Sequence, residues 1–258
     1  MRPINDTWTM TKRSLRHTVR SMDTIITVVM MPIAIMLLFV YVFGGALGEQ
    51  TGGVGYVDFI TPGVIVMTVA SGIAYAAVRL SIDLQSGIIS RFRTMPVAPS
   101  SVLSGQATSS TLSTLFSCLL VILVAVLVGF RPVGEVGAWL MFAGLLVLFT
   151  LATTWMAMFF GLLAKTMEGA GAFSYILILL IFISPAFVPT ESMTPMLRSF
   201  AENQPITPIV ETMRSLLIQG TAGEHMGAAL AWSLGILAVF YSLALVLYRR
   251  RDPIPVPQ

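Results

Sequence analysis

Few residues in this sequence have the chemistry for catalysis or metal binding. Cys118 is the only cysteine, and His17 and His225 are the only histidines. These three residues lie far apart along the chain, and a structural zinc site needs about four such ligands together. A lone cysteine also excludes a disulfide within the chain. We therefore expect no metal centre and no cofactor bound by this chain.

The lysines show whether the chain could hydrolyse a nucleotide by itself. A phosphate-binding P-loop is a glycine-rich loop that ends in Gly-Lys-Ser or Gly-Lys-Thr. Lys12 follows Thr11 and Lys165 follows Ala164, so the sequence contains no P-loop. Nor does it offer a Ser/His/Asp set or paired carboxylates within one plausible pocket. We predict that the chain is not an enzyme.

The composition indicates what the elements around these residues must be. Of the 258 residues, 56% are hydrophobic and 10% are charged, whereas a soluble domain has about 25% charged residues. This shortage excludes a water-soluble catalytic domain and predicts a polytopic membrane protein. The net charge of +3 does not indicate nucleic-acid binding, because Lys and Arg gather on the cytoplasmic loops of membrane proteins.

Charge-free windows predict an all-α fold with six transmembrane helices, since about 20 mostly apolar residues cross a bilayer. We expect one transmembrane domain over residues 1–258, with a membrane part at 24–248 and a cytoplasmic tail at 249–258. The windows are Thr24–Gly48, Phe59–Val78, Thr94–Phe130 (loop-like up to Ser101), Val136–Ala164, Gly169–Thr190 and His225–Tyr248.

These windows are almost free of ionisable residues at depth. Proton- or ion-coupled carriers usually keep an Asp, Glu, His or Lys in mid-membrane. The chain therefore lacks an evident energy source of its own. If it drives transport, the energy should come from a partner through a cytoplasmic contact.

Positive residues predict the orientation, because they concentrate on the cytoplasmic side. Most of the 15 basic residues fall on one side of the predicted bundle: Arg2, Lys12, Arg13, Arg16, Arg20, Arg79, Arg91, Arg93, Lys165, Arg249, Arg250 and Arg251. The other side holds mostly acids: Glu49, Asp58, Glu135, Glu191, Glu202, Glu211 and Glu224, with Arg131, Arg198 and Arg214. Both termini should be cytoplasmic.

The segment 1–23 is predicted to form an amphipathic helix at the cytoplasmic membrane surface. Trp8, Leu15, Val19 and Met22 fall on one helical face, and basic residues occupy much of the rest. This pattern suits the interface with anionic lipid. The helix could simply anchor the chain or could bind a partner.

The cytoplasmic loop after the second span should contain a short helix. Ser81 is a candidate N-cap, Asp83 suits a helix start, and Pro96 should stop the helix near Thr94. Its apolar residues are grouped on a loop that faces water, which often marks a protein contact. Packing against the chain's own helix ends is the alternative. The apolar residues are Ile82, Leu84, Ile88, Ile89 and Phe92.

The long segment after the fifth span should carry a non-cytoplasmic amphipathic helix of about 12 residues, too short to cross. We expect Thr207 to cap it, Pro208 to be its first residue and Gly220 to end it. Glu211 and Arg214 could pair on its polar face for a few tenths of a kcal/mol. The helix could lie on the outer leaflet or form an outer cap on the bundle. Its apolar stripe is Ile209, Val210, Met213, Leu216 and Leu217.

Several motifs resemble the membrane (permease) subunit of type-2 ABC exporters, in particular the daunorubicin-resistance branch. They run from Gly87 to Val97, from Leu103 to Gly105, from Phe182 to Pro189, from Met193 to Pro195, and from Asn203 to Glu211 with Arg214. The resemblance covers essentially the whole chain in the order and spacing of its spans. One departure is Ala98-Pro99-Ser100, where many relatives carry an arginine.

This resemblance implies a second permease copy, expected as a homodimer, and two copies of a separate ABC ATPase subunit that binds ATP and Mg²⁺. It implies that the loop helix is the coupling helix, seated in a cleft of the ATPase, and that segment 1–23 is the family's elbow helix. It also places the chain in the bacterial plasma (inner) membrane. The ATPase-coupling residues would be Asp83, Gly87, Ile88, Arg91, Phe92, Met95 and Pro96.

The resemblance further implies a substrate path along the first, second and fifth spans. An apolar path with a few hydroxyls suits export of an amphipathic drug- or lipid-like substrate. A polysaccharide or glycolipid exporter, a non-transporting anchor or scaffold, and an autonomous carrier or channel are the alternatives. The candidate lining residues are Phe39, Phe43, Thr61, Thr68, Ser71, Tyr75, Phe173 and Tyr175. Ordinary helix packing by aromatic and small residues is the favoured alternative for any single one of them.

Overall fold

The structure, a computed structural model, describes residues 22–48, 55–86, 99–164 and 166–250. In these residues every regular element is a helix, as predicted. The elements are α2 (Met22–Leu38), the π-helix η1 (Phe39–Phe43), α3 (Gly44–Leu47), α4 (Tyr56–Gln85), α6 (Pro99–Val128), α7 (Val136–Leu163), α8 (Met167–Ile183), the 3₁₀ turn η3 (Thr190–Ser192), α9 (Pro195–Asn203), α10 (Ile206–Arg214), the π-helix η4 (Ser215–Gln219) and α11 (Met226–Arg250).

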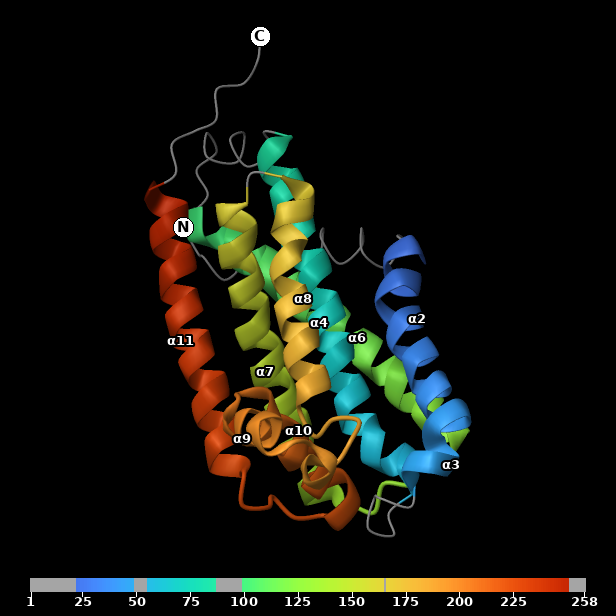
Figure 1. Ribbon diagram of the computed structural model, residues 1–258. Helices are drawn as coiled ribbons and strands as arrows, with labels where there is room; N and C mark the ends of the chain where they lie inside the picture. The colour runs from blue at the N-terminus through green and yellow to red at the C-terminus, as the bar shows by residue number, and fades with distance from the viewer. Residues whose placement is uncertain (1–21, 49–54, 87–98, 165, 251–258) are drawn as a thin grey trace.

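Four helices among the described residues are long and apolar enough to cross a membrane: α4, α6 (from Leu103), α7 and α11 (to Tyr248). They fall on four of the predicted windows. The other two windows contain shorter apolar helical stretches, Val28–Phe43 and Met167–Ile183. Successive helices run in alternating directions along the bundle (Figure 1).

Helix α4 is the centre of the bundle. It packs against α2, α6, α7, α8 and α10, whereas α11 lies at the edge and packs mainly on α7 (Figure 1). Gly72 lets α6 approach closely, because a Cβ at Gly72 would collide with the Thr114 side chain. Similarly, a Cβ at Gly161 of α7 would lie 2.9 Å from the Ala77 carbonyl oxygen. Small residues at crossings are the usual basis of close helix packing in membranes.

The structure at the end of α4 near Gln85 corrects the predicted helix start at Ser81. Ser81 is buried inside α4, which continues to Gln85, and Gln85 Nε2 donates a hydrogen bond to Ser81 Oγ at 3.1 Å. Leu80 and Leu84 extend the buried stripe of α4 across this point, so packing continues the helix where the capping signal suggested a break. The rest of the predicted coupling helix, from residue 87 to its predicted end near Thr94, lies outside the described residues. The same holds for residues 1–21 of the helix predicted at 1–23.

Helices α9 and α10 with η4 cover one end of the bundle, which we call the cap end (Figure 1). The predicted helix is present, but its predicted N-cap is wrong: α10 begins at Ile206, and Thr207 Oγ1 donates to the Ala201 carbonyl of α9. Gly220 ends η4 with a φ of +70°, which confirms the predicted end. The predicted apolar stripe is buried against the bundle, with α4 and α11 as neighbours of α10. Of the two predicted arrangements, the structure shows the cap.

Candidate functional site at the cap end

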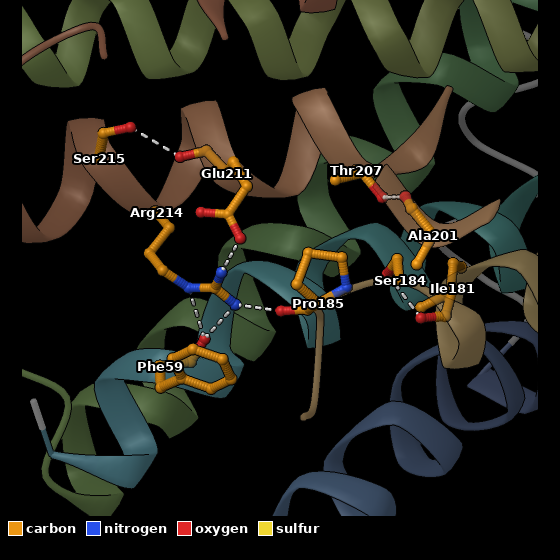
Figure 2. A network of polar contacts seen from close by, with 9 residues as sticks. All are labelled: Phe59, Ile181, Ser184, Pro185, Ala201, Thr207, Glu211, Arg214 and Ser215. Carbon is orange, nitrogen blue, oxygen red and sulfur yellow. Dashed lines mark hydrogen bonds and ion pairs between the residues drawn. The ribbon is translucent and has the colours of Figure 1, made fainter. Parts of the chain in front are cut away.

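Arg214 reaches from α10 into the bundle and joins three segments of the chain. Its Nε and Nη2 atoms donate to the Phe59 carbonyl of α4 at 3.2 and 3.0 Å, and Nη2 also donates to the Pro185 carbonyl at 2.6 Å (Figure 2). Nη1 pairs with Glu211 Oε1 at 2.5 Å. The guanidinium carbon lies 3.9 Å from the centre of the Phe59 ring, a cation–π contact. We call this set of contacts the Arg214 junction.

The Pro185 carbonyl needs such a donor because of the local sequence. Helix α8 ends at Ile183, and the last carbonyls of a helix have no partner within it. In a helix the Pro185 carbonyl would accept a hydrogen bond from the N–H four positions later. That residue is Pro189, which has no backbone N–H. The arginine therefore takes the place of a backbone donor that this turn lacks.

The last carbonyls of α8 find partners in the cap and in the residue that follows the helix. Gln204 Nε2, from the linker between α9 and α10, donates to the Leu180 carbonyl at 2.9 Å. Ser184 donates to the Ile181 carbonyl through both its backbone N–H and its hydroxyl, at 3.1 and 2.6 Å (Figure 2). The Gln204 side chain thus bonds the end of α8 to the cap, and Ser184 caps the helix locally.

Burial distinguishes Arg214 from an ordinary surface arginine. Its side chain is 11% exposed and that of Glu211 is 28% exposed. Burial lowers the pKa of the Arg214 guanidinium, while the Glu211 carboxylate acts in the opposite direction. The guanidinium stays charged in proteins, so it is held as a cation among backbone carbonyls, an aromatic face and one carboxylate.

The sequence analysis found the Glu211–Arg214 pair, and the structure confirms it. The predicted environment was wrong, because the pair is at a packed contact instead of on a polar face. The contacts with Phe59 and Pro185 were missed. Two local features of the sequence are consistent with these contacts. Arg214 is flanked on the helix by Val210 and Leu217 of the apolar stripe, and the Pro185/Pro189 spacing leaves a carbonyl without its donor.

The turn that follows α8, residues 184–188, is held against α4 by further contacts. A Cβ at Gly63 would lie 2.7 Å from the Ala186 Cβ, so only glycine allows this approach. The Tyr56 hydroxyl donates to the Phe187 carbonyl at 3.2 Å. The Phe187 ring stacks on Phe39 of η1 with a centroid distance of 5.0 Å. The π-helix η1 and helices α4 and α8 therefore meet at this turn.

The predicted path residues do not all lie on one surface of this chain. Thr61 and Thr68 are buried in α4, and their hydroxyls donate to the Val57 and Val64 carbonyls of the same helix. The Ser71 hydroxyl donates to the Met67 carbonyl in the same way.

Of the aromatic residues predicted to line the path, some are buried in the bundle and others are exposed on its surface. The ring centroids of Phe39 and Phe43 are 5.4 Å apart, and Phe43 is 43% exposed. Phe173 is buried and stacks on Phe160 of α7 at 4.7 Å. Tyr175 is 74% exposed on α8, and Tyr75 is half-buried on α4. The path assignment remains a prediction.

Of the predicted ATPase-coupling residues, the structure describes Asp83, which lies half-buried in the last turn of α4 at the end opposite the cap (Figure 1). Gly87, Ile88, Arg91, Phe92, Met95 and Pro96 lie outside the described residues. Within the described ranges, no group of three or more His, Cys, Asp or Glu residues could hold a metal ion.

Comparisons with known proteins place the sequence in a family. Residues 5–218 match the ABC-2 type transporter family. The chain is 31% identical over 234 residues to the daunorubicin resistance ABC transporter permease protein DrrB1 of Streptomyces coeruleorubidus, covering 88% of this chain and 80% of that protein. It is 24% identical over 240 residues to a probable doxorubicin resistance ABC transporter permease protein, DrrC, of Mycobacterium tuberculosis. That match covers 93% of this chain and 87% of the relative.

A more distant relative is the putative transport permease ycf38 of Porphyra purpurea, which is 23% identical over 224 residues and covers 82% of this chain and 75% of that protein. The family match includes α2, α4, the Arg214 junction and most of η4. The resemblance seen in the sequence motifs is thereby confirmed. The chain belongs to the ABC-2 type transporter family, and the relatives it matches include ABC transporter permeases named for daunorubicin and doxorubicin resistance.

Proposed function

We propose that this chain is the membrane-spanning subunit of an ATP-driven exporter, energised by a separate ABC ATPase subunit. The observation that carries the proposal is the family match over residues 5–218 in a chain whose sequence has no P-loop. A transporter of this family without its own nucleotide site needs a partner that hydrolyses ATP. The lack of ionisable residues at depth also argues against ion coupling.

The proposed topology has six crossings and two cytoplasmic termini in a bacterial inner membrane. α2 is followed without a gap by η1 and α3, so helix extends from Met22 to Leu47, which is enough to cross. α8 has 17 residues, and the turn at residues 184–188 extends the segment further across the membrane. The cap end then faces outward, in agreement with the acidic residues on that side.

The ATPase contact is assigned to the segment after α4. Asp83 lies at the last turn of α4 and leads directly into the segment that carries Ile88 and Phe92. Two apolar side chains on a water-facing loop fit a protein cleft. Two ATPase copies and a second, identical permease copy would complete the exporter.

The proposed substrate is an amphipathic drug- or lipid-like molecule. The support is the apolar character of α2, α4 and α8, together with the resistance to daunorubicin and doxorubicin named for the relatives. Exposed aromatic and aliphatic side chains on α2, η1 and α8 offer an apolar surface toward lipid or a second copy, among them Met31, Tyr41, Phe43, Tyr175, Leu179 and Phe182.

A reconstituted complex tests the function. The chain is co-expressed with an ABC ATPase subunit from the same genome, purified through a tag on the permease and placed in vesicles. ATP-dependent movement of daunorubicin into the vesicles is then followed by its fluorescence. We expect the ATPase to co-purify. The double variant Ile88→Asp/Phe92→Asp should lose transport at least tenfold, because two carboxylates cannot enter an apolar cleft.

The matched control is Val133→Asp, which adds a carboxylate at an exposed apolar position near the cap end. It should transport like the unmodified chain. Absence of a co-purifying ATPase would overturn the proposed function. Transport unchanged in Ile88→Asp/Phe92→Asp would overturn the coupling assignment alone.

A further inference from the structure

The Arg214 junction joins parts of the chain that are far apart in sequence. Phe59 is 155 residues from Arg214, and Pro185 is 29 residues away. One guanidinium group supplies donors to both carbonyls and to Glu211 in a fixed planar geometry. A lysine at this position would present a single ammonium group on a flexible stem, so the three-way contact requires arginine.

Separation of these segments would expose several buried groups together. The Arg214 side chain would lose its acceptors, and the Pro185 carbonyl would lose its donor. The Gly63–Ala186 packing and the hydrogen bond from Tyr56 to the Phe187 carbonyl would open as well. An unpaired buried charge or carbonyl is costly, so the junction favours motion as one body over opening between its parts.

Helix α4 connects this junction with the opposite end of the bundle. It runs as one 30-residue helix from Tyr56 to Gln85, a length of about 45 Å at 1.5 Å per residue. Phe59 lies in its first turn and Asp83 in its last. A displacement imposed near Asp83 would therefore be carried along α4 directly to the junction.

We propose that Arg214 is a positioning residue for transport: it holds the outer ends of α4 and α8 and the α10 cap as one unit, which moves without coming apart when the path opens. The inference rests on the proposed function, because the displacement comes from the ATPase. Arg214 touches no substrate in this role; it acts through the helices that it joins.

Ser184 provides a reporter inside the unit. It is fully buried, and Ser184→Cys is nearly isosteric. In a Cys118→Ser background, this cysteine is the only thiol. A membrane-impermeant maleimide is added from the outside, with and without ATP plus vanadate to trap the nucleotide-bound complex. Ser192→Cys, at an exposed position of η3, measures the amount of folded and correctly inserted protein.

With Arg214 present, we expect the cysteine at position 184 to stay protected both without nucleotide and in the trapped complex. Arg214→Met should raise its labelling rate, relative to position 192, at least tenfold in both conditions. Arg214→Lys should give an intermediate rate, because it retains the charge and part of the hydrogen bonding. Arg198→Met, which removes an exposed arginine on the neighbouring helix α9, should leave the cysteine protected.

Labelling of position 184 in the trapped complex of the chain with Arg214 would overturn the proposal, because the unit would then come apart during the cycle. Continued protection in Arg214→Met would also overturn it. The ratio of the labelling rates at positions 184 and 192 separates positioning from a general loss of folded protein. If Arg214→Met does not accumulate, the labelling rate of position 184 in Arg214→Lys provides the test. The arm without nucleotide needs no ATPase, so failure of the proposed function is recognised separately.

Discussion

Two short helices at the cap end carry the same kind of charge pair in different surroundings. Arg198 and Glu202 of α9 pair at 2.7 Å with side chains that are 48% and 46% exposed. Glu211 and Arg214 of α10 pair at 2.5 Å with only 28% and 11% exposed. The hydrogen bond with Glu202 raises the pKa of Arg198, whereas burial lowers that of Arg214. The surroundings, and not the pairing, make one arginine part of the core.

Replacing each arginine in turn should give the largest difference between the two pairs. Arg214→Met should lower the free energy of unfolding by about 3–5 kcal/mol, because the loss of one partner leaves the Glu211 carboxylate and the Pro185 carbonyl without a donor. Arg198→Met should leave thermal unfolding unchanged, since both groups of that pair are solvated. Unfolding in detergent micelles, followed by tryptophan fluorescence, measures both variants. Equal effects of the two changes would show that burial does not distinguish the pairs.

A smaller effect is expected from a change that adds volume at the junction without touching a charge. Gly63→Ala would place a Cβ 2.7 Å from the Ala186 Cβ and 2.8 Å from its carbonyl oxygen. Overpacking of this kind costs about 1–3 kcal/mol. Gly144→Ala on α7 is the matched control, because a Cβ there meets nothing within 4 Å. If Gly63→Ala unfolded at the same temperature as Gly144→Ala, the close approach of α4 and the turn after α8 would be refuted.

The difference between the two pairs also marks the limit of prediction from this sequence. The windows Val136–Ala164 and His225–Tyr248 nearly coincide with α7 and α11, because lipid requires a continuous apolar helix and that demand is local. Ser81 and Thr207 carry equally local capping signals, yet each lies inside a helix. Buried packing on both sides of Ser81 outweighs the capping preference there.

The junction itself could be predicted only in part. A spacing of three residues gave the Glu211–Arg214 pair, because side chains at that distance are neighbours on a helix. The same spacing carries no information on Phe59, which is 155 residues away. Pair spacing alone therefore does not distinguish the surroundings of Arg198 from those of Arg214. Only the packing of α10 on α4 makes the second arginine a buried contact.

Salt should separate the two pairs by the smallest measurable effect. A double-mutant cycle with Arg198→Met and Glu202→Gln, and another with Arg214→Met and Glu211→Gln, gives the coupling within each pair at low and at 1 M salt. At 1 M the screening length is about 3 Å, so the exposed α9 pair should lose its coupling. The α10 pair should keep most of its coupling, because ions cannot enter between a packed guanidinium and its carboxylate. Loss of coupling in both pairs alike would mean that water and ions reach the junction, and the contrast between α9 and α10 would then be one of degree.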